Sequence, residues 1–372
     1  MKEGISLQEM AAEITRQNQL KEDYLVDTRS LKLEPSGGQL YLHMYDKDVE
    51  VLEPFEVNSI AHRQVGSYLK IPADYYDRMR NDYPELLAEN VNSWFNREPA
   101  KRMLRTIGGR RSFLSNRYRR IDNMEIAKVV LPIIGQMEGA HFESCQITES
   151  RMYMKIVNTR LEAEVVPGDI VQAGLIISNS EVGQGSVNIQ PLVYRLVCKN
   201  GMVVNDARTR QYHTGRINTL EENFQLYSEE TLAAEDHAFV KKIEDTVKAA
   251  VEEARFSQVI DIMRNATAAK MNTADVPELV RLTSRDFHIT EDESAGVLQH
   301  LIEGNDLTLY GLSNAVTRHS QNVESYDRAT ALESIGYKIL TMPSRQWSKS
   351  TRWPLNTAVR RKTICITRLR LL

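Results

Sequence analysis

Cysteine is scarce in this chain of 372 residues, and its three cysteines are Cys145, Cys198 and Cys365. They lie far apart, are odd in number and form no CxxC pair, which disfavours both a disulfide framework and a zinc site. Such sparse cysteine usage is typical of the reducing cytoplasm, where we expect the protein to act. We expect Cys198 to be inert packing in an apolar strand rather than a nucleophile.

Long apolar runs are also absent. The stretch at residues 129–134 holds only six residues, one of them proline, whereas a membrane helix needs about 20 apolar residues. The mean hydropathy is −0.41. Residues 1–4 carry charge and lead into an amphipathic stretch, unlike a secretory signal. The sequence therefore predicts no membrane-spanning segment and no membrane partner.

Several catalytic motifs are missing. The chain contains no GxxxxGK[ST] and no GxGxxG, and its eight histidines form no HExxH pair. These absences argue against a P-loop, a dinucleotide fingerprint and a zinc protease site. Glu162 and Glu164 are paired carboxylates, but nothing beside them would position a water or a metal. We expect no catalytic residue, no metal and no cofactor, and a binding protein rather than an enzyme.

Acidic residues are nearly absent from two stretches of a chain whose formal net charge is −3. Residues 341–372 carry eight basic residues and no acidic one. Residues 97–120 contain one acidic residue, Glu98, and nine basic ones: Arg97, Lys101, Arg102, Arg105, Arg110, Arg111, Arg117, Arg119 and Arg120. Basic stretches on an acidic chain favour directed contact with an anion. The alternative is a solvated face that pairs with the protein's own acidic residues.

Hydrophobic periodicity predicts an α+β fold. Ser6 and Glu9 fit a capping box that opens a helix, and residues 35–38 fit a turn. Further helices are expected at 57–69, 75–79, 85–95, 123–134, 276–282, 291–303 and 309–317. Another helix is expected to begin at residue 231, and it carries an apolar stripe over 239–254. Strands are expected at 40–44, 112–115, 141–148, 152–157, 170–178, 187–198 and 202–204. Gly108-Gly109 and Lys199–Gly201 predict chain reversals.

The short connections between the central strands favour a mostly antiparallel sheet with packed helices, followed by a helical C-terminal part. In the strand at 152–157, Met152, Met154 and Ile156 are expected on one face. Four regions follow: an N-terminal helix and strand region at 1–107, a central α+β sheet domain at 108–219, a helical region at 220–340, and a loosely ordered basic tail at 341–372.

A glycine-rich segment at 179–186 separates two of the predicted strands. Gly183 and Gly185 form a GxG, but residue 188 is Asn188 and a strand follows, so the dinucleotide motif does not fit. Free backbone amides in such a hairpin can meet a phosphate, which makes Gly183 and Gly185 a candidate phosphate-binding loop. The alternative is an ordinary tight turn.

The basic stretch at 97–120 is the leading candidate for function, because its arginines are interleaved with Trp94, Phe95, Phe113 and Tyr118. Single-stranded nucleic acid is held by cations along its phosphates and by aromatic rings that stack on its bases. Candidate contacts are Arg110, Arg111, Arg117, Tyr118, Arg119 and Arg120, with Arg195, Lys199, His213 and Arg216 as a second group. Alternatively, Phe113 and Tyr118 belong to the core.

Four segments resemble a known family: 113–123 (FLSNRYRRIDN), 179–183 (NSEVG), 194–202 (YRLVCKNGM) and 327–333 (DRATALE). They look like the phage/plasmid-like proteins of the domain of unknown function 932, over about residues 50–340. The resemblance implies carriage by phages, prophages or plasmids and no settled activity. Residues 348–372 depart from that pattern. The order of helix, strands and basic hairpin is also similar in outline to single-strand-annealing recombination proteins, by analogy of architecture only.

Three functions are consistent with these observations. The first is a mobile-element protein that binds single-stranded nucleic acid in DNA recombination or replication, without a catalytic site. The second is an interaction factor whose helical part acts on a host defence or regulatory protein. The third is an enzyme that holds a phosphate at the Gly183 loop. A homo-oligomer is compatible with each of them.

Overall fold

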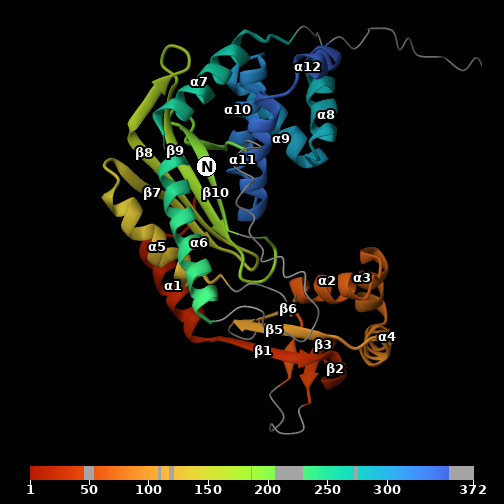
Figure 1. Cartoon of the computed structure of the whole chain (residues 1–372). Helices are drawn as coiled ribbons and strands as arrows, with labels where there is room; N and C mark the ends of the chain where they lie inside the picture. The colour runs from red at the N-terminus through yellow and green to blue at the C-terminus, as the bar shows by residue number, and fades with distance from the viewer. Residues whose placement is uncertain are drawn as a thin grey trace, which may run out of the picture.

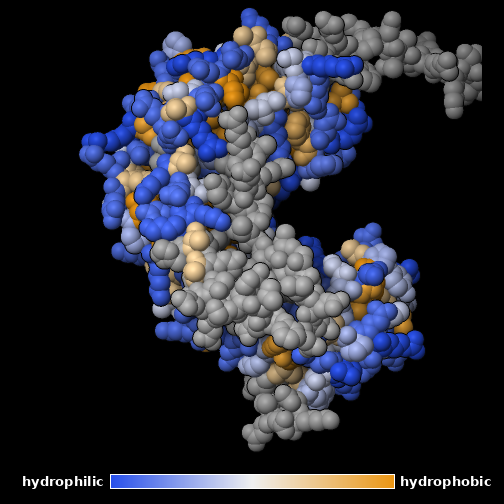
Figure 2. Space-filling view, in the orientation of Figure 1, coloured by the Kyte–Doolittle hydropathy of each residue, from blue (hydrophilic) through white to orange (hydrophobic). Residues whose placement is uncertain are grey.

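The computed structural model of the chain describes residues 1–45, 54–107, 110–116, 121–185, 187–205, 229–250, 252–271 and 275–351. A larger part is built around a five-stranded sheet, and a smaller part contains two three-stranded sheets (Figure 1). Hydrophilic residues cover much of the visible face of both parts (Figure 2). None of the helices in these ranges combines the length and apolar character of a membrane span. The predicted α+β class is confirmed.

The large sheet is antiparallel throughout, as predicted, with the strand order β11-β10-β9-β8-β7. Its strands are β7 (Ala140–Ile147), β8 (Met152–Glu164), β9 (Ile170–Asn179), β10 (Asn188–Arg195) and β11 (Asn200–Val203). The first half of β8 is buried on both faces, and not on the Met152, Met154 and Ile156 face alone. The reason is that helices cover both faces of the sheet (Figure 1).

The reversal between β10 and β11 lies earlier than predicted. Arg195 pairs with Asn200, so the turn spans residues 196–199, and Asn200 and Gly201 are already strand residues. Lys199 adopts the left-handed conformation, with φ 50°. Cys198 therefore lies half-buried in a turn, and its predicted position in an apolar strand is wrong.

One face of the sheet packs against α1 (Leu7–Gln19), α5 (Asn123–Gln136) and α6 (Glu229–Ala250). This core is apolar and includes Met152, Met154 and Ile156 of β8. Capping boxes open two of these helices, the predicted one at Ser6 and Glu9 and a second at Asp122 and Glu125.

The other helices pack around the β11 edge and onto both faces of the sheet. They are α7 (Glu253–Ala268), α8 (Val276–Asp286), α9 (Glu291–Gly304), α10 (Leu309–His319), α11 (Tyr326–Leu340) and α12 (Ser344–Thr351). The predicted stripe at 239–254 spans two helices, because α6 ends at Ala250 and α7 begins at Glu253. Within it Ile243 and Val247 are buried and Ala254 is exposed.

In the smaller part, β1 (Lys21–Asp27), β5 (Lys101–Ile107) and β6 (Arg110–Ser115) form one sheet, in the order β1-β5-β6. The other sheet consists of β2 (Leu31–Ser36), β3 (Gln39–Met44) and β4 (Phe55–Glu56). A short 3-10 helix, Thr28–Ser30, joins the sheets, and α2 (Ser59–Tyr68), α3 (Ala73–Asp82) and α4 (Pro84–Arg97) pack against them. The predicted turn at 35–38 joins β2 to β3, and Gly37 and Gly38 both have positive φ.

The region predicted as a basic tail begins inside the folded part. Met342 and Trp347 are buried, with exposed fractions of 7% and 8%, and both belong to the core formed by α7–α12. Residues 352–372, where most of the tail's charge lies, are outside the described ranges.

Candidate nucleic-acid interface and an adjoining polar pocket

The basic stretch at 97–120 forms the end of α4 and the hairpin of β5 and β6. Ile107 pairs with Arg110, so the chain reverses at Gly108-Gly109 as predicted. The two glycines themselves lie outside the described residues. The hairpin is joined to the large sheet's core through residues 116–123, which lead into α5.

Arg105 of this stretch is directed inward. Its guanidinium is fully buried and lies 2.7 Å from Asp23 and 2.7 Å from Asp122. Burial alone would lower the pKa of Arg105, but the hydrogen bonds and charges of Asp23 and Asp122 raise it above its ordinary value. Arg105 is therefore neutralised within the fold and is not available to an anion in solution.

Arg102 and two of the aromatic residues also belong to the interior. The Arg102 guanidinium lies 4.7 Å from the Tyr68 ring centroid and 4.6 Å from that of Phe113. Phe95 and Phe113 are buried and stack on each other, with ring centroids 5.7 Å apart. The interpretation of Phe95 and Phe113 as base-stacking rings is wrong, because both fill the core of the smaller part.

An exposed aromatic and cationic corner remains, formed by Trp94, Arg97 and Lys101. Trp94 is 39% exposed and lies one turn before Arg97 on α4, so the two side chains share a helix face. Arg97 and Lys101 are exposed, and neither makes an ion pair with any residue that the structure describes. This corner has an exposed ring and two exposed cations, of which Lys101 lies directly across from Asp27 in the β1–β5 pairing.

Most of the predicted contact residues lie at or beyond the edge of the description. Arg110 and Arg111 are in β6, opposite Ile107 and Thr106, but their side chains are not described. The remaining members of the first group, and two of the second, lie outside the described residues: Arg117, Tyr118, Arg119, Arg120, His213 and Arg216.

Arg195 and Lys199, from the second group, are 4 residues apart at the end of β10 and differ in environment. Arg195 donates to Asp169 at 2.6 Å, and Asp169 also accepts from the Tyr310 hydroxyl at 2.8 Å. Arg195 is thus held by a buried carboxylate, whereas the Lys199 side chain is exposed in the turn. Two further cations lie at this turn, because the Arg318 guanidinium donates to the Cys198 carbonyl at 3.0 Å and the Met1 ammonium group donates to the Lys199 carbonyl.

The glycine-rich segment is a structured loop after β9. Gly183 and Gly185 have φ of 74° and 144°, which explains glycine at both positions. The Gln184 amide donates to the Ser180 hydroxyl at 3.0 Å, and Arg151 donates to the Gln184 carbonyl. A Cβ atom on Gly185 would lie 2.7 Å from Nη2 of Arg151. The absence of a side chain there lets the Arg151 guanidinium lie against the loop.

This loop also connects the two parts of the molecule. The Gln64 side chain of α2 donates to the Val182 carbonyl at 2.8 Å and accepts from the Phe113 amide of β6 at 2.7 Å. The basic hairpin and the glycine loop are therefore linked by one side chain, and Arg151 lies against the same loop.

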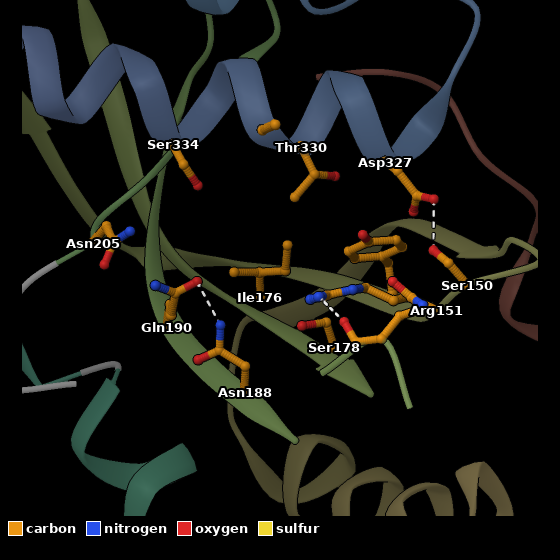
Figure 3. A pocket seen from close by; sticks show the side chains of 13 residues that line it. Ser150, Arg151, Ile176, Ser178, Asn188, Gln190, Asn205, Asp327, Thr330 and Ser334 are labelled. Carbon is orange, nitrogen blue, oxygen red and sulfur yellow. Dashed lines mark hydrogen bonds between the residues drawn. The ribbon is translucent and has the colours of Figure 1, made fainter. Parts of the chain in front are cut away.

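A pocket of about 720 Å³ opens beside the loop, between the sheet and α11 (Figure 3). Its lining is predominantly polar: Ser150, Arg151, Tyr153, Ile176, Ser178, Gln184, Asn188, Gln190, Asn205, Asp327, Thr330, Ala331 and Ser334. The lining strands contribute alternate residues of one face, because Tyr153, Ser178 and Asn188 pair directly across β8, β9 and β10. The opposite face of these same strands is apolar.

A buried ion pair lies next to this pocket on the same face of β8. Lys155 Nζ is 2.7 Å from Glu333 Oε2, and both side chains are fully buried. Nζ also lies 4.6 Å from the Tyr326 ring centroid. Burial lowers the pKa of Lys155, and the charge of Glu333 partly opposes this shift.

The family model of the Domain of unknown function (DUF932) matches residues 111–361, more than half of the chain. The chain belongs to this family. No curated protein and no solved structure gives a significant match.

The DUF932 match starts later and ends later than the resemblance at 50–340 suggested. It includes both walls of the pocket, at residues 150–205 and 327–334, and it includes α12. Trp94, Arg97 and Lys101 precede it. The pocket is thus part of the DUF932 segment, and the exposed corner is an N-terminal neighbour of that segment.

Sequence reasoning missed Arg151 and Asp327 as site residues. A signal was present, because Tyr153, Ser178, Asn188 and Gln190 are polar residues at alternate positions of otherwise apolar strands. Such residues on a covered sheet face indicate a polar cavity. Asp327 could not be found in this way, since its helix meets the sheet only in the folded chain.

Proposed function

We propose that this DUF932 protein binds single-stranded nucleic acid at the β5–β6 hairpin and the adjacent end of α4. Arg110, Arg111, Arg117, Arg119 and Arg120 contact phosphates, and Tyr118 stacks on a base. The structural observation that supports this proposal is the exposed corner, where Trp94 and Arg97 share one face of α4 and the exposed Lys101 opens β5. Stacking platforms flanked by cations are what single strands require.

Binding to labelled oligonucleotides, measured by fluorescence anisotropy over a salt series, tests the proposal. For Z neutralised phosphates, log affinity falls with log salt at a slope of about −0.7Z. In the double variant Arg97→Gln/Lys101→Gln the slope should become shallower by about 1.4, because each cation that neutralises a phosphate contributes about 0.7 to it. Lys338→Gln is the matched control, since Lys338 is an exposed lysine on α11.

The stacking contribution is tested separately with Trp94→Leu. Base stacking on an aromatic ring contributes about 1–3 kcal/mol, so the variant should bind about five- to 150-fold more weakly. The salt slope should be unchanged, because no cation is removed. A flat salt response of the unmodified protein, or equal binding by all variants, would contradict the proposal.

We further infer that the protein acts in recombination or replication of mobile elements, within the cytoplasm and without a catalytic step of its own. The resemblance to phage/plasmid-like proteins supports this inference. An annealing assay with two complementary strands distinguishes recombination from storage or protection of single strands. Faster annealing in the presence of the protein is the expected result, and inhibition of annealing would exclude a strand-annealing role.

A further inference from the structure

We propose that the pocket between β8–β10 and α11 binds a nucleoside monophosphate group, with the phosphate at Arg151 and the nucleoside along the polar walls. This is a second site, separate from the exposed corner of Trp94, Arg97 and Lys101. Its ligand is either a free mononucleotide or the phosphorylated end of a strand. The pocket volume of about 720 Å³ lies within the range of about 300–1,000 Å³ of small-molecule sites.

Arg151 provides the anion-binding group. One of its nitrogens, Nη2, is fixed by the Gln184 carbonyl, and Gly185 leaves the room that this position needs. Nε and Nη1 make no hydrogen bond to the described residues, and no carboxylate of these residues lies within ion-pairing distance. A guanidinium that is positioned but not neutralised matches the two-oxygen recognition of a phosphate.

Asp327 on the α11 wall selects for a ligand that also carries hydroxyl groups. Its carboxylate accepts from the Ser150 hydroxyl at 2.7 Å and from the Thr148 hydroxyl at 3.1 Å, and it faces the sheet (Figure 3). A carboxylate accepts further hydrogen bonds, and carboxylates bind ribose hydroxyls in other nucleotide sites. Its negative charge disfavours a ligand that is anionic throughout.

The β10 side of the pocket carries side-chain amides, whose hydrogen-bond donors and acceptors can pair with the edge of a nucleobase. Asn188 Nδ2 donates to Gln190 Oε1 at 3.0 Å, which leaves Asn188 Oδ1 as an acceptor and Gln190 Nε2 as a donor (Figure 3). Side-chain amides with one free donor and one free acceptor match the edges of nucleobases. In addition, Thr330 Oγ1 is buried and has no hydrogen-bond partner in the described part of the chain.

Thr330 Oγ1 is the lining atom of this pocket that is buried without a partner among the described residues. Buried polar groups without partners lower stability, and the opposite face of the same strands is filled with methionine, isoleucine and leucine. The fold could cover both faces with apolar side chains, yet here it retains Ser178, Asn188 and Gln190. A bound polar ligand supplies the partner that Thr330 Oγ1 lacks.

Isothermal titration of the full chain with adenosine 5′-monophosphate tests the site, with adenosine and inorganic phosphate as separate probes. Adenosine monophosphate should bind more tightly than either fragment. Arg151→Gln should weaken its binding about tenfold or more, because hydrogen bonds to a charged group are removed. Arg160→Gln is the matched control, since Arg160 lies in β8, the strand that follows Arg151, and its side chain is 62% exposed.

Gly185→Ala is a second variant, which keeps the arginine at residue 151, and it should also weaken nucleotide binding because the added Cβ displaces the Arg151 guanidinium. Thermal melting of each variant confirms that it is folded. Equal affinity for adenosine and its monophosphate, equal binding by Arg151→Gln and the unmodified protein, or no binding at all would overturn the proposal. Binding of phosphate as tight as that of the nucleotide would do so too.

Competition separates the two ligand sources. If an oligonucleotide with a 5′-phosphate displaces the mononucleotide and its 5′-hydroxyl counterpart does not, the pocket binds a strand end. If neither displaces it, the ligand is a free mononucleotide. The Arg97→Gln/Lys101→Gln variant should retain nucleotide binding, so a failure of this site and a failure of the proposed function give different results.

Discussion

The ion pair of Lys155 and Glu333 is a costly feature at the scale of single residues. Both side chains are fully buried, and Glu333 Oε1 has no partner among the described residues. Taking two charges out of water costs free energy that their attraction only partly restores. The pair joins β8 to α11 directly behind the pocket, so it fixes the distance between the two walls.

Substitution of one residue of the Lys155–Glu333 ion pair should lower the stability of the folded protein. Lys155→Met leaves the Glu333 carboxylate buried without its cation, and the free energy of unfolding should fall by about 3–5 kcal/mol. The double variant Lys155→Met/Glu333→Leu should recover most of this stability, because no unpaired charge remains. Chemical denaturation measures both values.

Lys241→Met is the control for this pair. Lys241 is 59% exposed and pairs with Glu244 on α6, and exposed pairs contribute less than about 1 kcal/mol. If Lys155→Met were no more destabilising than Lys241→Met, the buried pair would not hold the pocket walls in place.

At the scale of secondary-structure elements, a bidentate ion pair between Glu293 and Arg328 joins α9 to α11. Arg328 donates to both oxygens of Glu293, at 2.7 Å and 2.6 Å, and the Thr290 amide donates to the same carboxylate at 2.9 Å. The hydrogen bonds from Arg328 are the largest cause of a pKa of Glu293 of about 2, against an ordinary value of 4.5; burial opposes them and Thr290 assists. This carboxylate therefore stays charged in the folded protein under mildly acidic conditions.

The pH dependence of stability follows from this lowered pKa. The unfolded chain takes up a proton at Glu293 below about pH 4.5 and the folded chain only near pH 2, so the stabilisation is complete above pH 4.5 and is lost as the pH falls towards 2. The difference in unfolding free energy between the unmodified protein and Glu293→Gln should be constant above pH 4.5 and shrink below it. Urea denaturation across pH measures it, with Glu324→Gln as the exposed control. A difference that did not change with pH would refute the assignment.

Individual elements were largely predictable from the sequence, and their packing was not. The capping residues Ser6 and Glu9 and the glycines of the β2–β3 turn act locally, so their patterns predicted the elements correctly. The inward direction of Arg105 depends on Asp23 and Asp122, which are distant in sequence. The pocket depends on α11 lying over β8–β10, and no periodicity within one segment contains that information.

At the scale of the whole molecule, the glycine loop holds the smaller part against the larger one. Glu181 accepts from Lys21 of β1 at 2.7 Å and from the Asn123 amide at the start of α5 at 2.6 Å. A carboxylate at the N-terminus of a helix is also favoured by the helix dipole. Gln64 adds the contact between α2, β6 and Val182. The basic hairpin and the pocket are thus kept in a fixed relation across one loop.

Gln64→Leu tests whether this link orders the hairpin relative to the loop. The variant leaves the Phe113 amide and the Val182 carbonyl without their partner, and each unsatisfied buried group costs about 1–3 kcal/mol. Hydrogen exchange of the Phe113 amide should therefore become faster, whereas Ile177 in the middle of the large sheet should keep its protection. Gln299→Leu is the matched control, because Gln299 is exposed and its side chain donates to Glu303 of the same helix, α9. Unchanged exchange at Phe113 would show that the strand pairing with β5 alone holds β6, and that the two candidate sites are free to move independently.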